Sequence, residues 1–363
     1  MKSSIGSKIR LTVFGESHGP AIGCVLEGLP AGYKIDFDFL DAQMSRRAPG
    51  KDKTATARRE DDKPQILTGL LDGVTTGAPL AIVIQNNNTI SKDYSNLVTQ
   101  PRPNHADYAA GVKYGGNNDI RGGGHFSGRL TAPIVAAGAI CRSILSEQGI
   151  TVGGHILSIG GISDTPFDSV GVNKEQLSAL NLKLFALNDT SKEEPMRDVI
   201  YKARLSLDSV GGSVELAAVG LPAGVGNPMF YGVENVLASI LYGIPAVKGV
   251  SFGAGFEFAS MYGSDANDRM YMDESGAVKC LSNNCGGITG GITNGMPITV
   301  KVALKPTPSI AKPQETLNLQ TGETEPLEIH GRHDPCIVPR ALPALEAAFA
   351  IGILDLLAQD GKL

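Results

Sequence analysis

Five of the six histidines in this 363-residue chain lie in short segments rich in glycine or proline. They are His18, His105, His125, His330 and His333. Histidine has the side-chain pKa nearest neutrality, so it is suited to proton transfer and to anion binding. Glycine beside it lets a ligand approach the backbone closely. Because these segments are spread along the chain, we expect distant loops to assemble one site.

Arginine is concentrated in one stretch of the sequence, although the net charge is −5. Seven of the 14 arginines fall between residues 46 and 129. An acidic chain argues against nucleic acid as the main partner. Because arginine binds carboxylates and phosphates through two parallel hydrogen bonds, the stretch predicts a site for a small polyanion. A solvated basic face is the alternative that this pattern leaves open.

The composition, 42% hydrophobic and 19% charged, indicates a soluble globular protein with an ample core. The first residues lack a hydrophobic signal core, and we expect no apolar run to approach the about 20 residues of a membrane span. The cysteines are odd in number and lack metal-ligand spacing: Cys24, Cys141, Cys280, Cys285 and Cys336. We therefore expect free thiols in a reducing cytoplasm, no metal site and no membrane partner.

A glycine-rich turn at 121–129 runs directly into a helix predicted from Thr131. Such a turn aims backbone N–H groups and the positive end of the helix dipole at an anion. Its spacing matches neither the Walker A motif nor the dinucleotide fingerprint, and Phe126 is suited to lie against a flat ring. The spacing alone leaves a phosphate site and a structural turn equally open.

Ser17 and His18 lie in a tight turn that follows a predicted strand. Neighbouring side chains diverge, so this pair does not have the geometry of a hydrolase triad. We expect anion binding or acid catalysis from His18. A second glycine-rich turn at 283–292 and the lysine, hydroxyl and proline residues of 305–309 indicate further ligand-binding loops.

Hydrophobic periodicity predicts alternating strands and helices. The strands cover 9–14, 22–27, 80–84, 214–219, 247–252 and 298–304. The helices cover 105–113, 192–208, 131 to about 146 and 341 to about 359, with another opening after Asn173. The expected caps are Asn104, Asn173 and Ser191, and Asp38 for a helix that ends near Arg47.

Two pairs of similar segments indicate an internal repeat. Gly-Leu-Pro-Ala-Gly occurs at 28–32 and again at 220–224, and 76–84 resembles 294–302. Two related halves, about 1–150 and 210–363, would explain both pairs, whereas chance similarity in a glycine-rich chain is the alternative. No low-complexity linker separates the halves, so we expect one large α+β domain over 1–363.

Taken in order, these motifs resemble the chorismate synthase family from about Ile9 to Leu357. Segments 15–23, 121–138 and 332–346 are similar to its three signature regions. Further matches are Arg102-Pro103, His105-Ala106-Asp107, Ala246-Val247-Lys248-Gly249, the glycine pairs within 286–291 and Lys305-Pro306-Thr307. The resemblance implies a β-α-β sandwich with an internal pseudo-repeat.

The resemblance also implies a lyase of the shikimate pathway of aromatic amino-acid biosynthesis. Family members convert 5-enolpyruvylshikimate 3-phosphate to chorismate by 1,4-anti elimination of phosphate and a ring hydrogen. They require reduced FMN although the reaction has no net redox change, some reduce their flavin with NADPH, and they are usually homotetramers. The substrate carries two carboxylates and a phosphate, which explains the arginine stretch better than a solvated face does.

Matching the motifs residue by residue implies three sets of site residues. The catalytic set is His18, His105 and Asp334, with the histidines as acids and Asp334 in a proton relay at flavin N5. The substrate-binding set is Arg46, Arg47, Lys53, Arg58, Arg59, Arg129 and Arg340. The cofactor-binding set is Arg47, Lys53, His125, Phe126, Ser127, Pro245, Ala246, Gly290, Lys305, Pro306, Thr307, Pro308, Ser309 and Arg332.

The chain departs from the family pattern at a few positions. His125-Phe126 stands where the family commonly has Arg-Ser, and Ala48, Lys53 and Asn284 replace frequent arginine, arginine and histidine. An FMN-dependent oxidoreductase is the alternative enzyme class for the same residues. A non-catalytic flavin-binding module is the third, although it would not need the three predicted acid groups.

Overall fold

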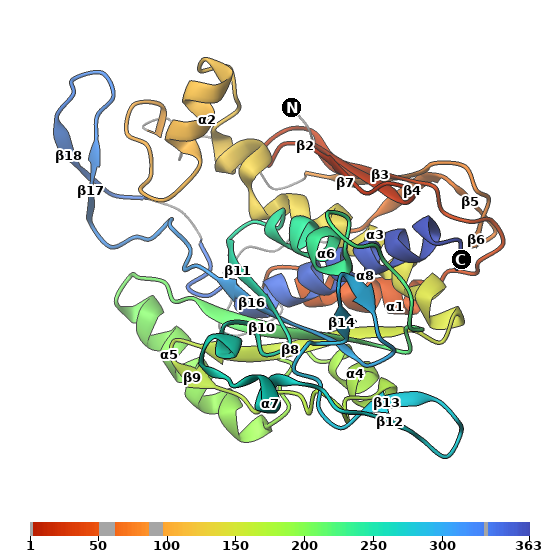
Figure 1. Ribbon diagram of the computed structural model, residues 1–363. Coiled ribbons are helices and arrows are strands. Elements are labelled where there is room, and N and C mark those ends of the chain that lie inside the picture. Colours follow the sequence, from red (N-terminus) through yellow and green to blue (C-terminus); the bar gives the residue numbers. More distant parts are fainter. Residues whose placement is uncertain (1–2, 51–61, 87–96, 330–332) are drawn as a thin grey trace.

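Two five-stranded antiparallel sheets enclose a layer of helices (Figure 1). The computed structural model describes residues 3–50, 62–86, 97–329 and 333–363. The first sheet has the order β1 (Ser4–Ile5), β2 (Arg10–Gly15), β3 (Ala21–Glu27), β7 (Leu80–Gln85), β4 (Gln65–Thr68). The second has the order β11 (Val247–Phe252), β16 (Ile298–Leu304), β10 (Gly212–Val219), β8 (Thr151–Ile159), β9 (Ile162–Ser163).

Four helices form the layer between the sheets: α1 (Phe37–Arg47), α3 (Thr131–Glu147), α6 (Val233–Tyr242) and α8 (Val338–Gln359). Helices α3 and α8 pack along each other. A Cβ atom added to Gly138 of α3 would lie 2.2 Å from the Cβ of Ala347 in α8, so this close approach requires glycine. One continuous hydrophobic core extends from the first sheet through these helices to the second.

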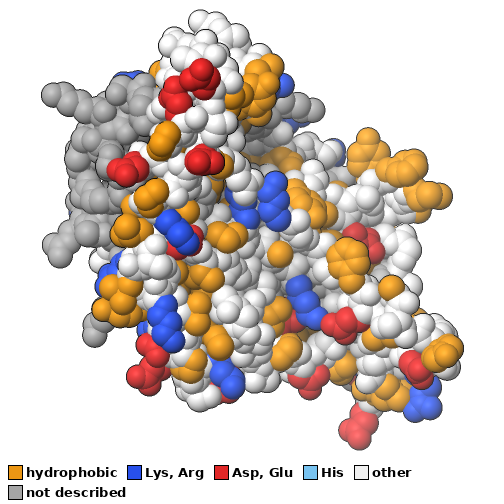
Figure 2. Space-filling model, turned by 90° about the vertical axis from the view of Figure 1, so that its left-hand side faces the viewer, with side chains coloured by type: hydrophobic (Ala, Val, Ile, Leu, Met, Phe, Trp, Pro, Cys, Tyr) orange, Lys and Arg blue, Asp and Glu red, His pale blue; other side chains and the backbone are white. Residues whose placement is uncertain are grey.

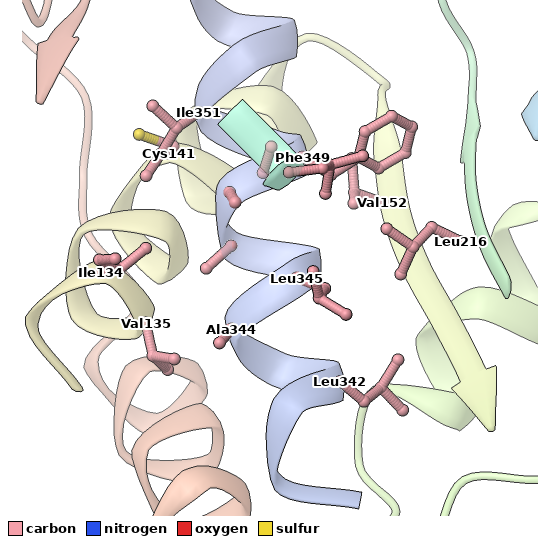
Figure 3. Close-up of a cluster of buried hydrophobic side chains, with 14 of the residues drawn as sticks. Ile134, Val135, Cys141, Val152, Leu216, Leu342, Ala344, Leu345, Phe349 and Ile351 are labelled. Atoms are coloured by element: carbon pink, nitrogen blue, oxygen red, sulfur yellow. The ribbon is translucent and has the colours of Figure 1, made fainter. Parts of the chain in front are cut away.

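Helix α8 lies at the centre of that core. In Figure 3, Leu345 and Phe349 of α8 extend toward Val152 of β8 and Leu216 of β10. All four side chains are buried. Burial of apolar surface at about 25 cal/mol per Å² is the main stabilising contribution in such a core.

The outer face of the second sheet is covered by α4 (Lys174–Leu180) and α5 (Glu193–Leu205) (Figure 1). Successive residues of β8 show the two faces. A Cβ atom at Gly153 would meet Leu177 of α4, whereas one at Gly154 would meet Leu342 of α8. Because β8 is covered on both faces, it is buried throughout most of its length.

Smaller elements complete the described chain. The helical ones are α2 (Asp107–Tyr114), α7 (Gly263–Ala266) and the 3₁₀ turns Arg121–Phe126, Gly128–Leu130, Thr190–Lys192 and Gly255–Ser260. The hairpins are β5 (Leu70–Leu71) with β6 (Val74–Thr75), β12 (Met270–Met272) with β13 (Val278–Cys280), β14 (Ile288–Thr289) with β15 (Ile292–Thr293), and β17 (Gln314–Leu317) with β18 (Thr324–Leu327).

The two Gly-Leu-Pro-Ala-Gly segments occupy corresponding places. Each follows the central strand of its sheet, β3 or β10. Thr75 Oγ1 donates a hydrogen bond of 2.7 Å to the carbonyl of Pro30, and Thr293 Oγ1 donates one of 2.7 Å to that of Pro222. After Thr75 the chain continues into β7, which pairs with β3. After Thr293 it continues into β16, which pairs with β10.

The six predicted strands are all present, and the bounds of β11 and β16 agree to the residue. The sequence analysis missed β8, because two consecutive glycines and a buried histidine interrupt its apolar pattern. The predicted mixture of helix and sheet in one α+β fold agrees with the two antiparallel sheets and the helices between them.

Three of the predicted helix caps are wrong. Asp36, not Asp38, accepts the hydrogen bond from Phe39 N at the start of α1. Asn104 has a φ of +57° and does not cap α2, whose first turn follows Ala106. At the turn before α5, Asp189 rather than Ser191 is the cap. The cap at Asn173 is confirmed, since its side chain accepts from Gln176 N at 3.0 Å.

Two helical segments, Gly128–Glu147 and Val338–Gln359, are long and apolar enough to cross a membrane by length and composition. The expectation that no apolar run approaches this length was therefore wrong. In both segments 89% of the most apolar window is buried inside the protein, as in core helices. Their hydrophobicity is explained by the sheets that cover the helix layer on both sides.

Candidate active site

A cavity of about 810 Å³ opens beside the helix layer and is lined by segments from all parts of the chain. Small-molecule sites usually measure about 300–1,000 Å³. Its cationic lining residues are Arg47, Arg102, Arg129, Lys248, Lys305 and Arg340. Of the acidic side chains in the described residues, only Asp334 is among the lining. The cavity is therefore suited to a ligand with several negative charges.

His18 lies against Gly122, which lines the cavity, and His105, itself a lining residue, lies against the adjacent Gly123. A Cβ atom at Gly122 would lie 2.6 Å from Cδ2 and 2.7 Å from Nε2 of His18. One at Gly123 would lie 3.3 Å from Nε2 of His105. Both glycines also have a positive φ, +59° and +84°. The glycine-rich turn thus lets the two imidazoles approach one short piece of backbone, which side chains would prevent.

The ring of His105 is oriented by a buried carboxylate. Its Nδ1 lies 2.6 Å from Oδ1 of Asp107, and Asp107 also accepts two hydrogen bonds from Arg102, of 2.7 and 2.8 Å. Burial alone would raise the pKa of Asp107, but the hydrogen bonds from Arg102 and His105 hold that pKa well below its usual range. The ionised carboxylate favours the tautomer that carries the proton on Nδ1, although Nη2 of Arg102 also lies 3.0 Å from Nδ1. In that tautomer Nε2, which lies toward Gly123, has a free lone pair.

Arg47 and Arg129 enter the cavity wall from different elements and share one carboxylate. Each forms an ion pair with a different oxygen of Asp62. Arg47 ends α1, whereas Arg129 lies in the 3₁₀ turn before α3. Nearby, Arg340 at the start of α8 pairs with Asp334 and donates from Nε to the carbonyl of Arg47 at 3.0 Å. Three arginines are thus held together on one side of the cavity.

The turn at 125–127 is held mainly by its own hydrogen bonds. Nδ1 of His125 lies 2.8 Å from the carbonyl oxygen of Gly15, and Nε2 lies 2.8 Å from Oγ of Ser3. Both ring nitrogens therefore tie the turn to the first sheet. Phe126 is partly exposed, with its ring centroid 6.5 Å from that of Tyr114. Ser127 caps the following 3₁₀ turn by accepting from Arg129 N at 3.3 Å.

Two chain segments of the lining meet at Ala246 and Lys305. Lys305 N donates to the carbonyl of Ala246 at 3.0 Å, and Ala246 has a φ of +75°, which is rare for a non-glycine residue. Burial and the nearby charge of Lys248 lower the pKa of Lys305. Oγ1 of Thr307 is buried without a hydrogen-bond partner among the described residues. Such an atom costs stability unless a ligand supplies the missing partner.

Known proteins resemble this chain over nearly its whole length. The family model described as "Chorismate synthase" matches residues 9–358. "Chorismate synthase" of Methanocaldococcus jannaschii is 44% identical over 370 residues, which cover 99% of this chain and 97% of the relative. The protein of the same name in Thermococcus gammatolerans is 45% identical over 350 residues, 96% of each chain.

A solved structure leads to the same family. "Crystal Structure of Chorismate Synthase" has a TM-score of 0.75 and 29% identity, and covers 98% of this chain and 93% of that chain. The chain belongs to the chorismate synthase family. Its activity is therefore that of a lyase acting on a phosphate ester to form chorismate.

Most residues expected from chorismate synthase motifs do lie around the cavity. The lining includes His105, Asp334, Arg47, Arg129, Arg340, His125, Phe126, Ser127, Pro245, Ala246, Lys305, Thr307, Pro308 and Ser309. His18 is not itself a lining residue, but its imidazole lies against Gly122, which is one. Lys53, Arg58, Arg59, Arg332 and His330 lie outside the described residues.

Three residues expected to bind ligands are not among the cavity lining. Arg46 is turned into the core, where it pairs with Glu346 of α8 at 2.5 Å. Gly290 lies in the turn between β14 and β15, and Pro306 lies between two lining residues without being one. Their position therefore does not support the ligand contacts that the chorismate synthase motifs imply for them.

The sequence analysis did not assign roles to Arg102, Asp107, Asp62 or Lys248. Asp107 follows His105 by two residues, a spacing from which an orienting carboxylate could have been inferred. Nothing in the sequence around Asp62 indicates that its carboxylate joins two distant arginines. Within the part of the chain that the structure describes, no three His, Cys, Asp or Glu side chains gather as metal ligands.

Proposed function

We propose that the cavity is the place where this chain eliminates phosphate from 5-enolpyruvylshikimate 3-phosphate. In this 1,4-anti elimination the C–O bond to phosphate breaks, a ring hydrogen is removed and a new double bond forms in chorismate. The observation that carries the assignment is the approach of His18 and His105 to the adjacent glycines Gly122 and Gly123. His105 lines the cavity and His18 lies against the lining residue Gly122, so two groups capable of proton transfer lie close to one mainly cationic cavity.

The cationic lining supplies the binding energy for the substrate. The substrate brings two carboxylates and a phosphate, and each anion must be paired when it leaves water. Arg47, Arg129 and Arg340 form one group of linked cationic lining residues, and Lys248 and Lys305 form another. Guanidinium groups bind phosphate and carboxylate with defined geometry, so the arginine group orients the substrate for elimination.

His18 and His105 act as the acids of the reaction. One protonates the departing phosphate and the other protonates the reduced flavin. Asp107 fixes the tautomer of His105, so that Nε2 is the atom that transfers the proton. Asp334 assists a proton relay at flavin N5, and its ion pair with Arg340 holds it at the cavity wall.

The lining fits reduced FMN as the cofactor. The buried hydroxyl of Thr307 has no hydrogen-bond partner among the described residues, so a phosphate or ribityl group would satisfy it. Lys305 and Ser309 lie in the same loop, where Lys305 binds the carbonyl of Asn104 and Ser309 accepts from Arg102. Phe126 is suited to lie against the flat isoalloxazine ring, and Ala246 supplies backbone at the rim. Reduced FMN, when bound, supplies reducing equivalents that are returned within the cycle, so the reaction has no net redox change.

NADPH is the proposed reductant of the bound flavin. An FMN-dependent oxidoreductase would consume reduced nicotinamide in proportion to its product, whereas the lyase turns over with a catalytic amount of flavin. The deciding experiment is chorismate formation under anaerobic conditions with dithionite-reduced FMN. Chorismate in excess over flavin supports the lyase, and no chorismate under these conditions rejects it. Oxidation of NADPH in the presence of FMN then shows whether the chain reduces its own flavin.

The free cysteines and the exposed apolar side chains bear on the cellular compartment and the assembly of the chain. We place the chain in the cytoplasm, where the five free cysteines would stay reduced. We also propose that it assembles as a homotetramer. Large apolar side chains that are at least 73% exposed are Met229, Phe230, Tyr231, Phe256 and Tyr262. Apolar side chains also lie among Lys and Arg on the face shown in Figure 2. Exposed apolar surface of this kind is typical of contacts between subunits.

The chain is a single catalytic domain built from two related halves. The two sheets have matching strand orders around their Gly-Leu-Pro-Ala-Gly loops, which supports an internal duplication. The position of β8 in the second sheet, which matches that of β2 in the first, supports a second half that begins near residue 150, before the expected bound of about 210.

A further inference from the structure

The chain builds two groups in which a buried carboxylate lies between two arginines. Arg46 and Arg142 share Glu346, and Arg47 and Arg129 share Asp62. The side chains of both carboxylates are 0% exposed. The groups differ in location, because Arg47 and Arg129 line the cavity whereas Arg46 and Arg142 do not.

Asp62 joins cavity residues that are far apart in the sequence. Its two oxygens bind one arginine each, so neither guanidinium can turn without breaking an ion pair. Other bonds fix the same side chains: Arg47 Nη2 donates to the carbonyl of Gly128 at 3.2 Å, and Arg129 Nε donates to Oδ1 of Asn86 at 2.8 Å. Two guanidinium groups this close repel each other in a medium of low dielectric constant, and the carboxylate between them offsets the repulsion.

We propose that Asp62 is a positioning residue for anion binding, which holds Arg47 and Arg129 together as a preformed site for the phosphate group of the substrate. The inference rests on the proposed function of the cavity, since it assigns those arginines to an anionic ligand. Burial alone would raise the pKa of Asp62, but the charges and hydrogen bonds of Arg47 and Arg129 lower it. Asp62 therefore remains ionised at neutral pH.

Removal of the Asp62 charge has two opposite effects on a bound anion. The loss of a negative charge near the cavity favours the anion, whereas the separation of the two guanidiniums disfavours it. We expect the second effect to be larger, because anion binding by paired arginines depends on their relative geometry. The sign of the change in affinity therefore distinguishes a positioning carboxylate from one that only lowers the local charge.

The experiment is a calorimetric titration of inorganic phosphate into the full chain. We expect Asp62→Asn to weaken phosphate binding at least about tenfold, and Asp62→Glu, which keeps the charge but displaces it by one methylene, to be intermediate. Glu346→Gln is the matched control: it breaks the group outside the cavity, and should lower the Tm without changing the phosphate Kd. Phosphate binding by Asp62→Asn that equals or exceeds that of wild type overturns the proposal.

The Arg47→Gln variant tests whether the arginines bind the anion at all, independently of the role of Asp62. Weaker phosphate binding in Arg47→Gln but not in Asp62→Asn overturns the role of Asp62 alone. An unchanged Kd in Arg47→Gln rejects anion binding by these arginines, and the role of Asp62 with it. If Asp62→Asn does not fold, an Asp62→Glu variant with the wild-type Kd overturns the proposal.

Discussion

Arg46 and Arg47 are adjacent at the end of α1, yet their guanidinium groups bind different carboxylates. Arg46 reaches Glu346 of α8 within the helix layer, and Arg47 reaches Asp62 at the cavity wall. Successive residues of a helix are separated by about 100° around its axis, so one can face the core while the next faces a ligand. The same dipeptide thus stabilises the fold and builds the site.

Replacement of either acid histidine should abolish most of the activity. We expect His18→Ala and His105→Ala each to fold and to bind FMN, while turnover falls about 10²–10⁴-fold, the usual contribution of general acid–base groups. Single-turnover chorismate formation measures the loss, and flavin titration measures binding. Near-normal rates in both variants would remove the proposed acid roles.

Asp107→Asn should reduce kcat at least about tenfold while KM changes little, because Asp107 orients His105 rather than holding substrate. The variant also leaves Arg102 without its countercharge. Breaking such a buried pair costs about 3–5 kcal/mol, so a lower Tm is expected as well. Glu193→Gln is the control, since Glu193 pairs with the partly exposed Arg197 on α5, and neither residue lines the cavity. A Tm loss with unchanged kcat would leave Asp107 with a structural role only.

Thr307→Val should have opposite effects on stability and on flavin affinity. The hydroxyl of Thr307 is buried without a partner among the described residues, so its removal should leave the ligand-free Tm unchanged or raise it. FMN affinity should fall by the value of one hydrogen bond, about 0.5–1.5 kcal/mol. In Thr293→Val, by contrast, the lost hydroxyl has two backbone partners, and the Tm should fall. Unchanged FMN affinity in Thr307→Val would argue against contact with the cofactor.

His155 should make the stability of the second sheet depend on pH. Burial alone would lower its pKa, but hydrogen bonds to Asp164 and Glu215, at 2.7 and 3.0 Å, raise that pKa above 6.5. A group with a raised pKa in the folded state contributes its full stability below its ordinary pKa and loses it as pH rises through the raised value. The Tm should therefore decline above about pH 6.5, and less so in His155→Gln. Parallel Tm curves for both proteins would contradict this assignment.

Asp334→Asn separates a proton relay from a purely structural ion pair with Arg340. For a relay, we expect the Tm and FMN affinity to stay nearly unchanged while the single-turnover rate falls at least tenfold, about 1.4 kcal/mol of barrier. The measurements are thermal melting beside single-turnover flavin spectra. A destabilised variant with an ordinary rate would return Asp334 to a structural role.

The sequence by itself determined the local elements and the chemistry that is available. Alternating apolar residues predicted β11 and β16 to the residue, and the glycine-rich turn was placed correctly before α3. Local steric and hydrogen-bonding preferences act over a few residues, so they are visible in short segments. The order of the motifs also sufficed to indicate the family.

Only the tertiary structure decided which of these residues meet. It turned Arg46 into the core and bound both ring nitrogens of His125, and it brought Asp62 between Arg47 and Arg129. Such contacts join residues up to hundreds of positions apart, and they depend on how the helices pack between the two sheets. A side chain's charge is a property of the sequence, but its partner is fixed by packing, because burial allows a charge only where an opposite charge or hydrogen bond is within reach.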